Sequence, residues 1–272
     1  MLLIGITEIA LLLLLGLAVG AYGTVVGVGG GFLVAPLLLL IYKLSPASAA
    51  ATSLVVVFLN ATSGSISYLR RGRVDLRTAL VLALGTIPGA LIGPFIATHA
   101  PERAFRIAFS IFLFGMAAFL FFRPEPGRPV STVRVFDVGV ITRSFTDRGG
   151  DTFTYSYSVP LALAISFGVG ILSSAFGIGG GIVHVPALIY LMGLPVHIAT
   201  ATSQSVLTVT ALTGVIGYST GGHVVWHLAA AIGVGVIAGA QLGAAISHRV
   251  HGRWIVRILA MTVLILAIRL LG

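Results

Sequence analysis

The sequence predicts an all-α polytopic membrane protein of two inverted-topology repeats, each of about five helical elements, with broken or re-entrant glycine-rich segments. The first observation is composition. Of the 272 residues, 57% are hydrophobic and 8% are charged, whereas soluble domains carry about 25% charged residues. The other two observations are a series of apolar blocks and an internal duplication. Because no soluble core hides this much apolar surface, we expect a multi-pass protein of the cell membrane.

Eight apolar blocks define the elements in chain order. Most are close to the ~20 residues that cross a bilayer, but the first and the fifth are too long for one span. The first block lacks the basic start and the cleavage site of a signal peptide, so we expect it to be retained as a membrane helix. The blocks cover residues 1–42, 48–69, 78–97, 105–122, 159–192, 198–218, 228–246 and 254–271.

The second half of the chain repeats the first at an offset of 150 residues. Residues 27–93 and 177–243 are identical at 24 of 67 ungapped positions. GVGGGFLVAP at 27–36 aligns with GIGGGIVHVP at 177–186, and an ATS triplet follows each at the same spacing. Glycine, proline, threonine and serine that match in register indicate a duplication rather than shared apolar composition.

The basic residues predict that the repeats are inverted. The link 70–77 holds four arginines, its counterpart 220–227 holds neither Lys nor Arg, and the next link, 247–254, is basic again. Since basic links face the cytoplasm, equivalent links then lie on opposite sides, with both termini outside. Splitting each long block into a full helix and a short returning segment supplies the odd number of crossings that inversion needs. Arg103 and Arg106 lie in a link expected outside and are the exception.

These patterns divide the chain into repeat 1 at 1–123, a cytoplasmic linker at 124–158 and repeat 2 at 159–272. Two alternating stretches around DRGGD in the linker predict a β-hairpin. We expect a small lid that joins the halves, with a regulatory role as the alternative. The basic links serve orientation and lipid headgroup contact, and they lack the interleaved aromatic residues that nucleic acid binding needs. Cysteine is absent, which excludes disulfides and thiolate chemistry.

The glycine triplets predict helix breaks that bind an anion. In lipid, irregular backbone persists only where protein or a water-filled cavity covers it. A break at Gly29–Gly31 starts a half-helix near Phe32, whose first amides and dipole form an anion site without a charged side chain. Pro36 then lies near the first turn, and Gly179–Gly181 face the same midplane region from the other side. Close helix packing through small residues is the alternative.

Polar side chains follow each break at the start of the next helix. Hydroxyls and amides donate hydrogen bonds that complete an oxyanion shell, whereas interhelical or back-bonded hydrogen bonds are the alternative. His184 is an ionisable group at membrane depth, expected to carry a proton or contact the anion, unless it is a neutral side chain bonded to a backbone carbonyl. The predicted substrate-binding residues are Gly29, Gly30, Gly31, Thr52, Ser53, Asn60, Gly179, Gly180, Gly181, His184, Thr202, Ser203 and Gln204.

Missing residue types narrow the chemistry further. No Asp or Glu lies deep in an apolar block, since Glu8 is near the start of the first. A carboxylate relay for cations is therefore not expected, and a neutral to positive pathway suits an anion. There is no H-E-x-x-H cluster and no P-loop, so we expect no metal, no cofactor and no ATP coupling. An intramembrane serine protease based on Ser63 or Ser65 and a histidine lacks a recognisable oxyanion frame.

Together these residues resemble the sulfite exporter TauE/SafE family of membrane transporters. The resemblance rests on G-x-G-G-G-x-x-x-x-P in both halves, followed by AAATS at 49–53 and ATATS at 199–203, and it covers nearly the whole chain apart from 124–158. It implies transport of small sulfur-containing anions such as sulfite, sulfoacetate or related organosulfonates, driven by an ion gradient. Members of the family also serve as general anion permeases of unknown substrate, so the family name does not settle the substrate.

We therefore predict a secondary transporter, not an enzyme, that carries such an anion across the cytoplasmic membrane by alternating access. The expected partners are the anion, the lipid bilayer and a coupling proton, and a homo-oligomer is left open. An anion channel, a permease for another small anion and an intramembrane enzyme are the alternatives.

Overall fold

The computed structural model describes residues 5–122, 138–146, 148, 150–250 and 252–271. Helices form most of the described chain. The first half contains α1 (Ile6–Val26), α2 (Gly31–Leu40), α3 (Pro46–Arg70), α4 (Leu76–His99) and α5 (Glu102–Phe122). A hairpin of β1 (Val140–Thr146) and β2 (Thr152–Ser158) follows. The second half contains α6 (Val159–Phe176), α7 (Gly181–Pro186), a π-helical segment (Ala187–Leu191), α8 (Val196–Tyr218), α9 (Trp226–Ile246) and α10 (Gly252–Leu271), with 3-10 turns at Ser219–Gly221 and Ser247–Arg249.

Helix length and composition confirm the polytopic all-α membrane fold. Within the described residues, α1, α3, α4, α5, α6 and α9 are long and apolar enough to cross a membrane. The apolar helices Gly31–Leu40 and Gly181–Leu191 are shorter. At 1.5 Å per residue they reach only ~15 Å into a hydrocarbon layer of ~30 Å. Each overlong block is therefore a full helix followed by a short one.

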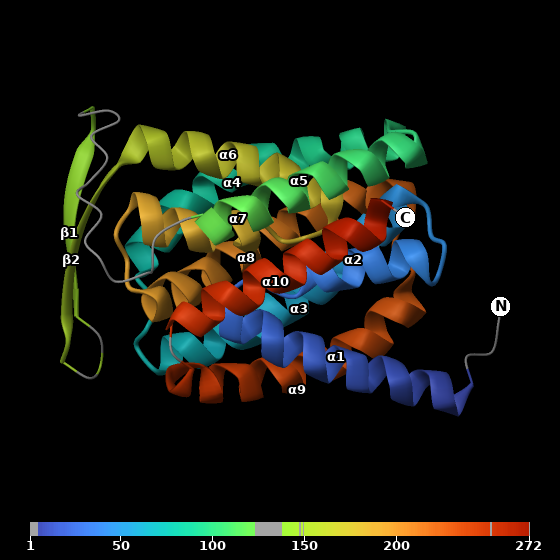
Figure 1. Cartoon of the computed structure of the whole chain (residues 1–272), viewed down its shortest axis with the longest axis horizontal. Coiled ribbons are helices and arrows are strands. Elements are labelled where there is room, and N and C mark those ends of the chain that lie inside the picture. Colours follow the sequence, from blue (N-terminus) through green and yellow to red (C-terminus); the bar gives the residue numbers. More distant parts are fainter. Residues whose placement is uncertain (1–4, 123–137, 147, 149, 251, 272) are drawn as a thin grey trace.

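The helices lie side by side along the long axis of the molecule (Figure 1). Both ends of the described chain lie at one end of this bundle, and the hairpin crosses the opposite end. α1 starts at the end far from the hairpin, whereas its repeat equivalent α6 starts at the hairpin itself. Equivalent helices thus run in opposite directions, which supports the predicted inversion. Which end faces the cytoplasm stays a prediction.

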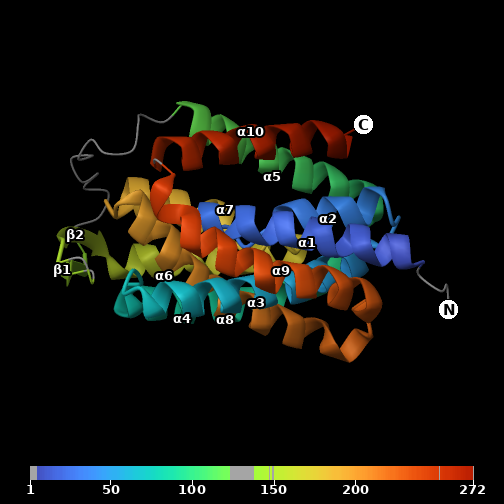
Figure 2. The same cartoon turned by 90° about the horizontal axis from the view of Figure 1, so that it is seen from below.

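Helices of one half pack mainly on helices of the other. α1 lies along α9, and its equivalent α6 lies along α4. α5 and α10 run together along one face of the bundle (Figure 2). α3 packs on α8 in the interior, and 78% of its most apolar window is buried, more than in the other spans. Since α3 and α8 carry the repeated polar residues, the fold places those residues at the centre.

The proline after each glycine triplet lies deeper in its helix than the sequence suggested. Pro36 is inside α2, beyond the first turn that begins at Gly31. Pro186 is the last residue of α7, where the chain widens into the π-helical segment. A proline inside a helix removes one backbone hydrogen bond and crowds the preceding turn, and π-turns commonly accommodate such disruptions.

The hairpin is attached to the bundle through Asp75. This buried carboxylate caps α4 by accepting hydrogen bonds from the amides of Arg77 (3.1 Å) and Thr78 (3.4 Å). It also accepts one from the Tyr155 hydroxyl of β2, and Arg143 of β1 lies 3.7 Å away. The hairpin thus pairs its strands antiparallel and rests on a helix end. Residues 124–137 of the predicted linker lie outside the described residues, and its boundaries stay a prediction.

Candidate functional site

Both glycine triplets lie where the structure breaks a membrane helix. After α1, Gly27, Gly29 and Gly30 have φ values of +79°, +79° and +76°, and α2 begins at Gly31. After α6, the equivalent glycines 177, 179 and 180 have φ values of +73°, +80° and +88°. Side chains other than glycine rarely adopt this left-handed conformation, so the triplets allow the chain to leave one helix and enter the next.

The two breaks touch each other. A Cβ added to Gly31 would lie 2.5 Å from the Gly177 carbonyl oxygen, and one added to Gly181 would lie 2.5 Å from the Gly27 carbonyl oxygen. These glycines are buried. The sequence predicted that the triplets face one region from opposite sides, and the missing side chains here allow the two backbones to come into direct contact.

Two serines at equivalent positions hold this contact together. Ser53 on α3 donates to the carbonyl of Gly177 (2.7 Å) and lies 3.2 Å from that of Gly31. Ser203 on α8 donates to the carbonyl of Gly27 (3.0 Å). Each hydroxyl therefore satisfies a backbone acceptor at the break of the other repeat.

The neighbouring threonines bond to links at the bundle ends. Thr52 Oγ1 accepts from the Val225 amide (3.0 Å), and Thr202 Oγ1 accepts from the Asp75 amide (3.2 Å). Val225 and Asp75 are themselves repeat equivalents. In this conformation the repeated hydroxyls are thus hydrogen-bonded to backbone groups of other segments and do not face an open cavity. This is the arrangement expected from the alternative of interhelical hydrogen bonds.

Unpaired donors gather at the break of repeat 1. The Gly29 amide donates to the Gly23 carbonyl (3.2 Å), whereas the amides of Gly30 and Gly31 have no partner in the described part of the chain. A Cβ added to Gly23 would lie 2.5 Å from the Gly30 nitrogen and 2.9 Å from Asn60 Nδ2. The Gly30 nitrogen and Asn60 Nδ2 therefore both lie against Gly23, where only the absence of a side chain allows them to come this close.

Asn60 belongs to a buried polar cluster that joins both halves. Thr24 on α1 donates to Asn60 Oδ1 on α3 (2.7 Å), and Gln204 Nε2 on α8 donates to Thr24 Oγ1 (3.2 Å). All three side chains have no exposed surface. Thr24 was not among the predicted site residues, although a threonine three positions before Gly27 in an apolar block was a usable signal.

His184 lies beside the other break, in the first turns of α7. Its side chain is fully buried. Nε2 lies 3.4 Å from Ser166 Oγ on α6, and Nδ1 has no hydrogen-bond partner among the described residues. Ser173 on α6, the equivalent of Gly23, also has a hydroxyl without a partner there. Repeat 2 thus has different free polar groups from repeat 1.

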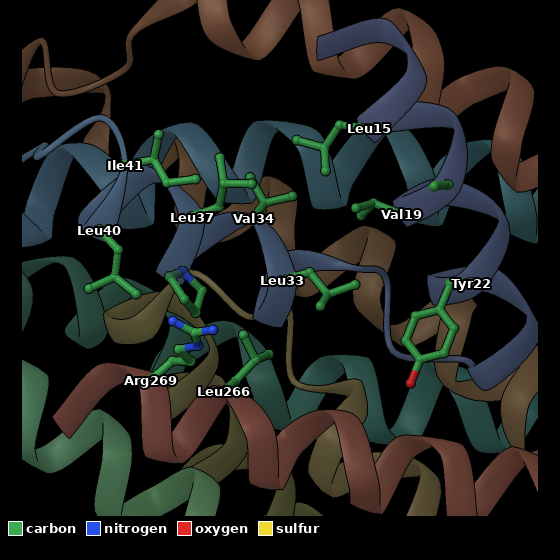
Figure 3. Close-up of a pocket in the computed structure, with 12 residues that line it drawn as sticks. Leu15, Val19, Tyr22, Leu33, Val34, Leu37, Leu40, Ile41, Leu266 and Arg269 are labelled. Carbon is green, nitrogen blue, oxygen red and sulfur yellow. The ribbon is translucent and has the colours of Figure 1, made fainter. Parts of the chain in front are cut away.

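A pocket of about 600 Å³ is lined by residues of α1, α2 and α10 (Figure 3). Its walls are aliphatic, with Tyr22 and the exposed Arg269 as polar members. Val34, the equivalent of His184, lines it. Such walls offer few hydrogen-bond donors, so the contacting breaks are kept as the candidate site.

The serines considered for protease chemistry are bonded elsewhere. Ser63 donates to the Ile237 carbonyl of α9 (2.9 Å), and Ser65 lies 3.4 Å from Thr208 Oγ1 of α8. Among the described residues, no group of three His, Asp or Glu side chains is placed to hold a metal ion.

Comparison with known proteins agrees with this architecture. The family described as Sulfite exporter TauE/SafE matches residues 12–270. The chain is 32% identical to "Probable membrane transporter protein YunE" of Bacillus subtilis (strain 168) over 268 residues, 96% of each chain. It is 28% identical to "Probable membrane transporter protein YjnA" of the same organism, over 96% of this chain and 98% of the relative. A "Probable membrane transporter protein" of Xylella fastidiosa (strain Temecula1) is 28% identical, over 87% of this chain and 82% of the relative.

No solved structure matches the chain. The family match nevertheless spans both helix breaks and every predicted site residue. The relatives are aligned over most of their length, and each is named as a membrane transporter. This chain is accordingly a multi-pass membrane transporter and belongs to the sulfite exporter TauE/SafE family.

Proposed function

We propose that this protein is a secondary transporter of small sulfur-containing oxyanions, such as sulfite, sulfoacetate or related organosulfonates. It carries them across the cytoplasmic membrane by alternating access of two inverted repeats. The family and the relatives give the coarser function of membrane transporter. The choice of an oxyanion rests on the chemistry of the contacting breaks, and on the absence of Asp and Glu deep in the apolar blocks.

The contact between the two breaks is the observation that carries this proposal. Helix starts with unpaired amides favour anions, because the amides and the helix dipole present positive charge without a charged side chain. The Gly30 nitrogen and Asn60 Nδ2, both without an acceptor among the described residues, lie against Gly23. A bare anion at this depth is costly, so a nearly complete shell of donors is needed.

The proposed shell includes all the predicted polar residues, in two roles. Asn60, Gln204 and His184 have free polar atoms in this conformation and contact the anion directly. Thr52, Ser53, Thr202 and Ser203 hold the breaks and links in place, and become donors when the two breaks separate. Gly179–Gly181 provide the second set of backbone amides.

Burial and the packing of the halves support alternating access. The proposed shell has no exposed surface, so substrate enters only when one half moves against the other. α1 on α9 and α6 on α4 form two equivalent interfaces that allow such rocking. His184 is the proposed proton-linked group, because it is a buried ionisable side chain beside the break.

Counterflow in proteoliposomes tests this function. Vesicles preloaded with unlabelled sulfite are expected to accumulate labelled sulfite transiently, because a carrier exchanges substrate across one alternating site. The Asn60→Leu variant is expected to raise the half-saturating concentration about tenfold, since a hydrogen bond to a charged group contributes ~1.5–3 kcal/mol. Gly115→Ala serves as the control, because a Cβ at Gly115 meets nothing within 4 Å.

Two results would contradict the proposal. Ionic currents without counterflow would identify an anion channel instead. Transport of a cation or a neutral solute, with none of sulfite, sulfoacetate, thiosulfate or taurine carried, would exclude the anion site.

A further inference from the structure

The cluster of Thr24, Asn60 and Gln204 joins three helices from both halves. Its hydrogen bonds form a chain in which Gln204 Nε2 donates to Thr24 Oγ1 and Thr24 Oγ1 donates to Asn60 Oδ1. The threonine hydroxyl has one proton, so it donates to one amide and accepts from the other. This chain leaves one atom of each amide group for a further partner.

Those two atoms have no partner among the described residues. They are Asn60 Nδ2, a donor, and Gln204 Oε1, an acceptor. If both amides are turned over and the chain runs in reverse, the free atoms become an Asn60 acceptor and a Gln204 donor. In either direction, the cluster presents one donor and one acceptor. Unpaired buried polar atoms are rare and costly, which points to a missing ligand.

The equivalent place at the break of repeat 2 lacks this cluster. The equivalents are Ser174, Thr210 and Leu54, and Leu54 offers no hydrogen bond. A Cβ added to Gly64 would lie 2.8 Å from Gln204 Nε2, and one added to Gly214 would lie 2.8 Å from Leu54 Cδ1. Both sites therefore leave room for a side chain of this size, and the difference between them is one of chemistry.

The free donor is also part of the break. Asn60 Nδ2 and the Gly30 nitrogen both lie against Gly23, which precedes Thr24 in the chain. The cluster thus extends the row of N–H donors at the start of α2 and adds one oxygen acceptor to it. α2 has ten residues, enough for an oriented helix dipole.

We propose that this cluster selects a protonated, monoanionic oxyanion over the fully deprotonated dianion. This inference rests on the function proposed above. An oxyanion with one O–H accepts hydrogen bonds from Asn60 and Gly30 and donates its own proton to the free amide oxygen. A dianion has acceptors only, so it leaves that oxygen unpaired and facing negative charge. Phosphate, sulfate and sulfite differ in the fraction that is a protonated monoanion near neutral pH. The cluster therefore binds them with different affinities at a given pH.

Binding measured by calorimetry in lipid nanodiscs tests this inference with three anions. Sulfite loses its proton near neutrality, methanesulfonate is a monoanion without an O–H, and sulfate is a dianion. We expect sulfite to bind about tenfold more tightly at about pH 6 than at about pH 8, since its protonated fraction falls over that range. Methanesulfonate is expected to bind equally at both pH values, and sulfate more weakly than sulfite at about pH 6.

Two variants test whether Gln204 is responsible for the pH dependence of sulfite binding. Gln204→Leu installs the residue that repeat 1 carries at the equivalent position, Leu54, and we expect it to weaken sulfite binding about tenfold at about pH 6 and to flatten its pH dependence. Methanesulfonate has no proton to donate to the Gln204 oxygen, so its binding is expected not to weaken and its affinity to stay independent of pH. Gln241→Leu is the matched control, because Gln241 bonds to Ser63 on the outer side of the bundle and its repeat equivalent is Leu91.

The same comparison of sulfite with methanesulfonate distinguishes protonation of the ligand from protonation of groups on the protein. Tyr68 on α3 donates to the Thr24 carbonyl (2.9 Å), and His184 on α7 lies beside the second break. A change in their charge affects sulfite and methanesulfonate alike, so the difference between the two anions isolates the proton of the ligand.

The outcomes separate the two proposals. If sulfite and methanesulfonate bind but sulfite affinity is the same at both pH values, or if Gln204→Leu keeps the full pH dependence, the selectivity inference is wrong. If no anion binds at either pH, the proposed function itself fails. The pH dependence of sulfite affinity is measured on the wild-type protein, so the selectivity inference can be tested even if Gln204→Leu is unstable.

Discussion

Ser53 and Ser203 are the residues on which the contact between the two breaks depends most directly. Each lies on a central helix and donates to a carbonyl that a helix end leaves without its usual partner. Because the acceptors belong to the other repeat, each serine links the two halves of the molecule. Local sequence identifies the serine, but not its acceptor.

Replacing Ser53 by alanine is expected to lower the free energy of unfolding by about 1–3 kcal/mol, because it leaves the buried carbonyl of Gly177 without a donor. Ser203→Ala is expected to have a similar effect through Gly27. Thermal or denaturant unfolding in detergent measures both. Ser219→Ala, at an exposed position, is the control and should change stability little; equal losses in all three variants would refute the special role of the crossed bonds.

At the scale of elements, small residues determine how closely the helices of the two halves approach. On α9, a Cβ at Gly239 would lie 2.2 Å from the Leu17 carbonyl oxygen of α1. On α4, a Cβ at Gly89 would lie 2.1 Å from the Phe167 carbonyl oxygen of α6. The two interfaces are equivalent, and in a membrane such close packing replaces the missing hydrophobic drive for association.

Gly239→Ala is therefore expected to separate α9 from α1 and to destabilise the fold by about 1–3 kcal/mol, as overpacking does. Gly115→Ala on α5 should instead stabilise slightly, by up to ~1 kcal/mol, because alanine is the better helix former and its Cβ meets nothing. Unfolding by a denaturing detergent compares the two. A stabilising effect of Gly239→Ala would contradict the close approach of these helices.

At the scale of the whole molecule, the hairpin is coupled to the centre through Asp75. The carboxylate of Asp75 binds Tyr155 and lies 3.7 Å from Arg143, while its backbone amide donates to Thr202 beside Ser203. The equivalent link in repeat 2 has Val225 in this position, bonded to Thr52 but without a carboxylate. The hairpin at one end of the bundle therefore contacts Asp75, which is in turn bonded to the predicted site residue Thr202.

Tyr155→Phe is expected to loosen the hairpin, raising hydrogen exchange of β2 amides about tenfold or more while the membrane helices are unaffected, because a buried hydrogen bond to a charged group is lost. Thr154→Val, at an exposed position of the same strand, is the control. Unchanged exchange in Tyr155→Phe would show that the hairpin is held by other contacts.

The pH dependence of this attachment has a definite sign. Burial, and then the hydrogen bond to Asp75, raise the pKa of the Tyr155 hydroxyl above its ordinary value of 10.0. The folded state therefore favours the neutral hydroxyl, whose contribution is fully present below about pH 10 and is lost as the pH rises through the folded pKa. Exchange of the hairpin, corrected for its intrinsic pH dependence, is expected to stay flat from neutral pH to about pH 10.

Periodicity and composition were sufficient for several parts of the fold. The overlong blocks divide at the glycine triplets, where φ is positive at Gly30 and Gly180. Ser53 and Ser203 lie at the breaks as the repeat implied. The partners of those residues were beyond reach, because Ser53 and Gly177 are 124 residues apart and no local pattern encodes such a pairing. A threonine in an apolar block marks Thr24 as a candidate, but its contacts with Asn60 and Gln204 arise only in the tertiary structure.

The amino-acid sequence by itself determined that the chain lies in a membrane, that it is duplicated and where its helices break. Apolar content, repeated motifs and the backbone conformations that only glycine adopts easily can all be recognised from the sequence alone. Only the tertiary structure decided that the breaks touch, that Thr24, Asn60 and Gln204 form one cluster, and that the hairpin rests on Asp75. These contacts depend on how helices from the two halves pack against each other, and packing is decided by the shape of whole surfaces rather than by any single stretch of sequence.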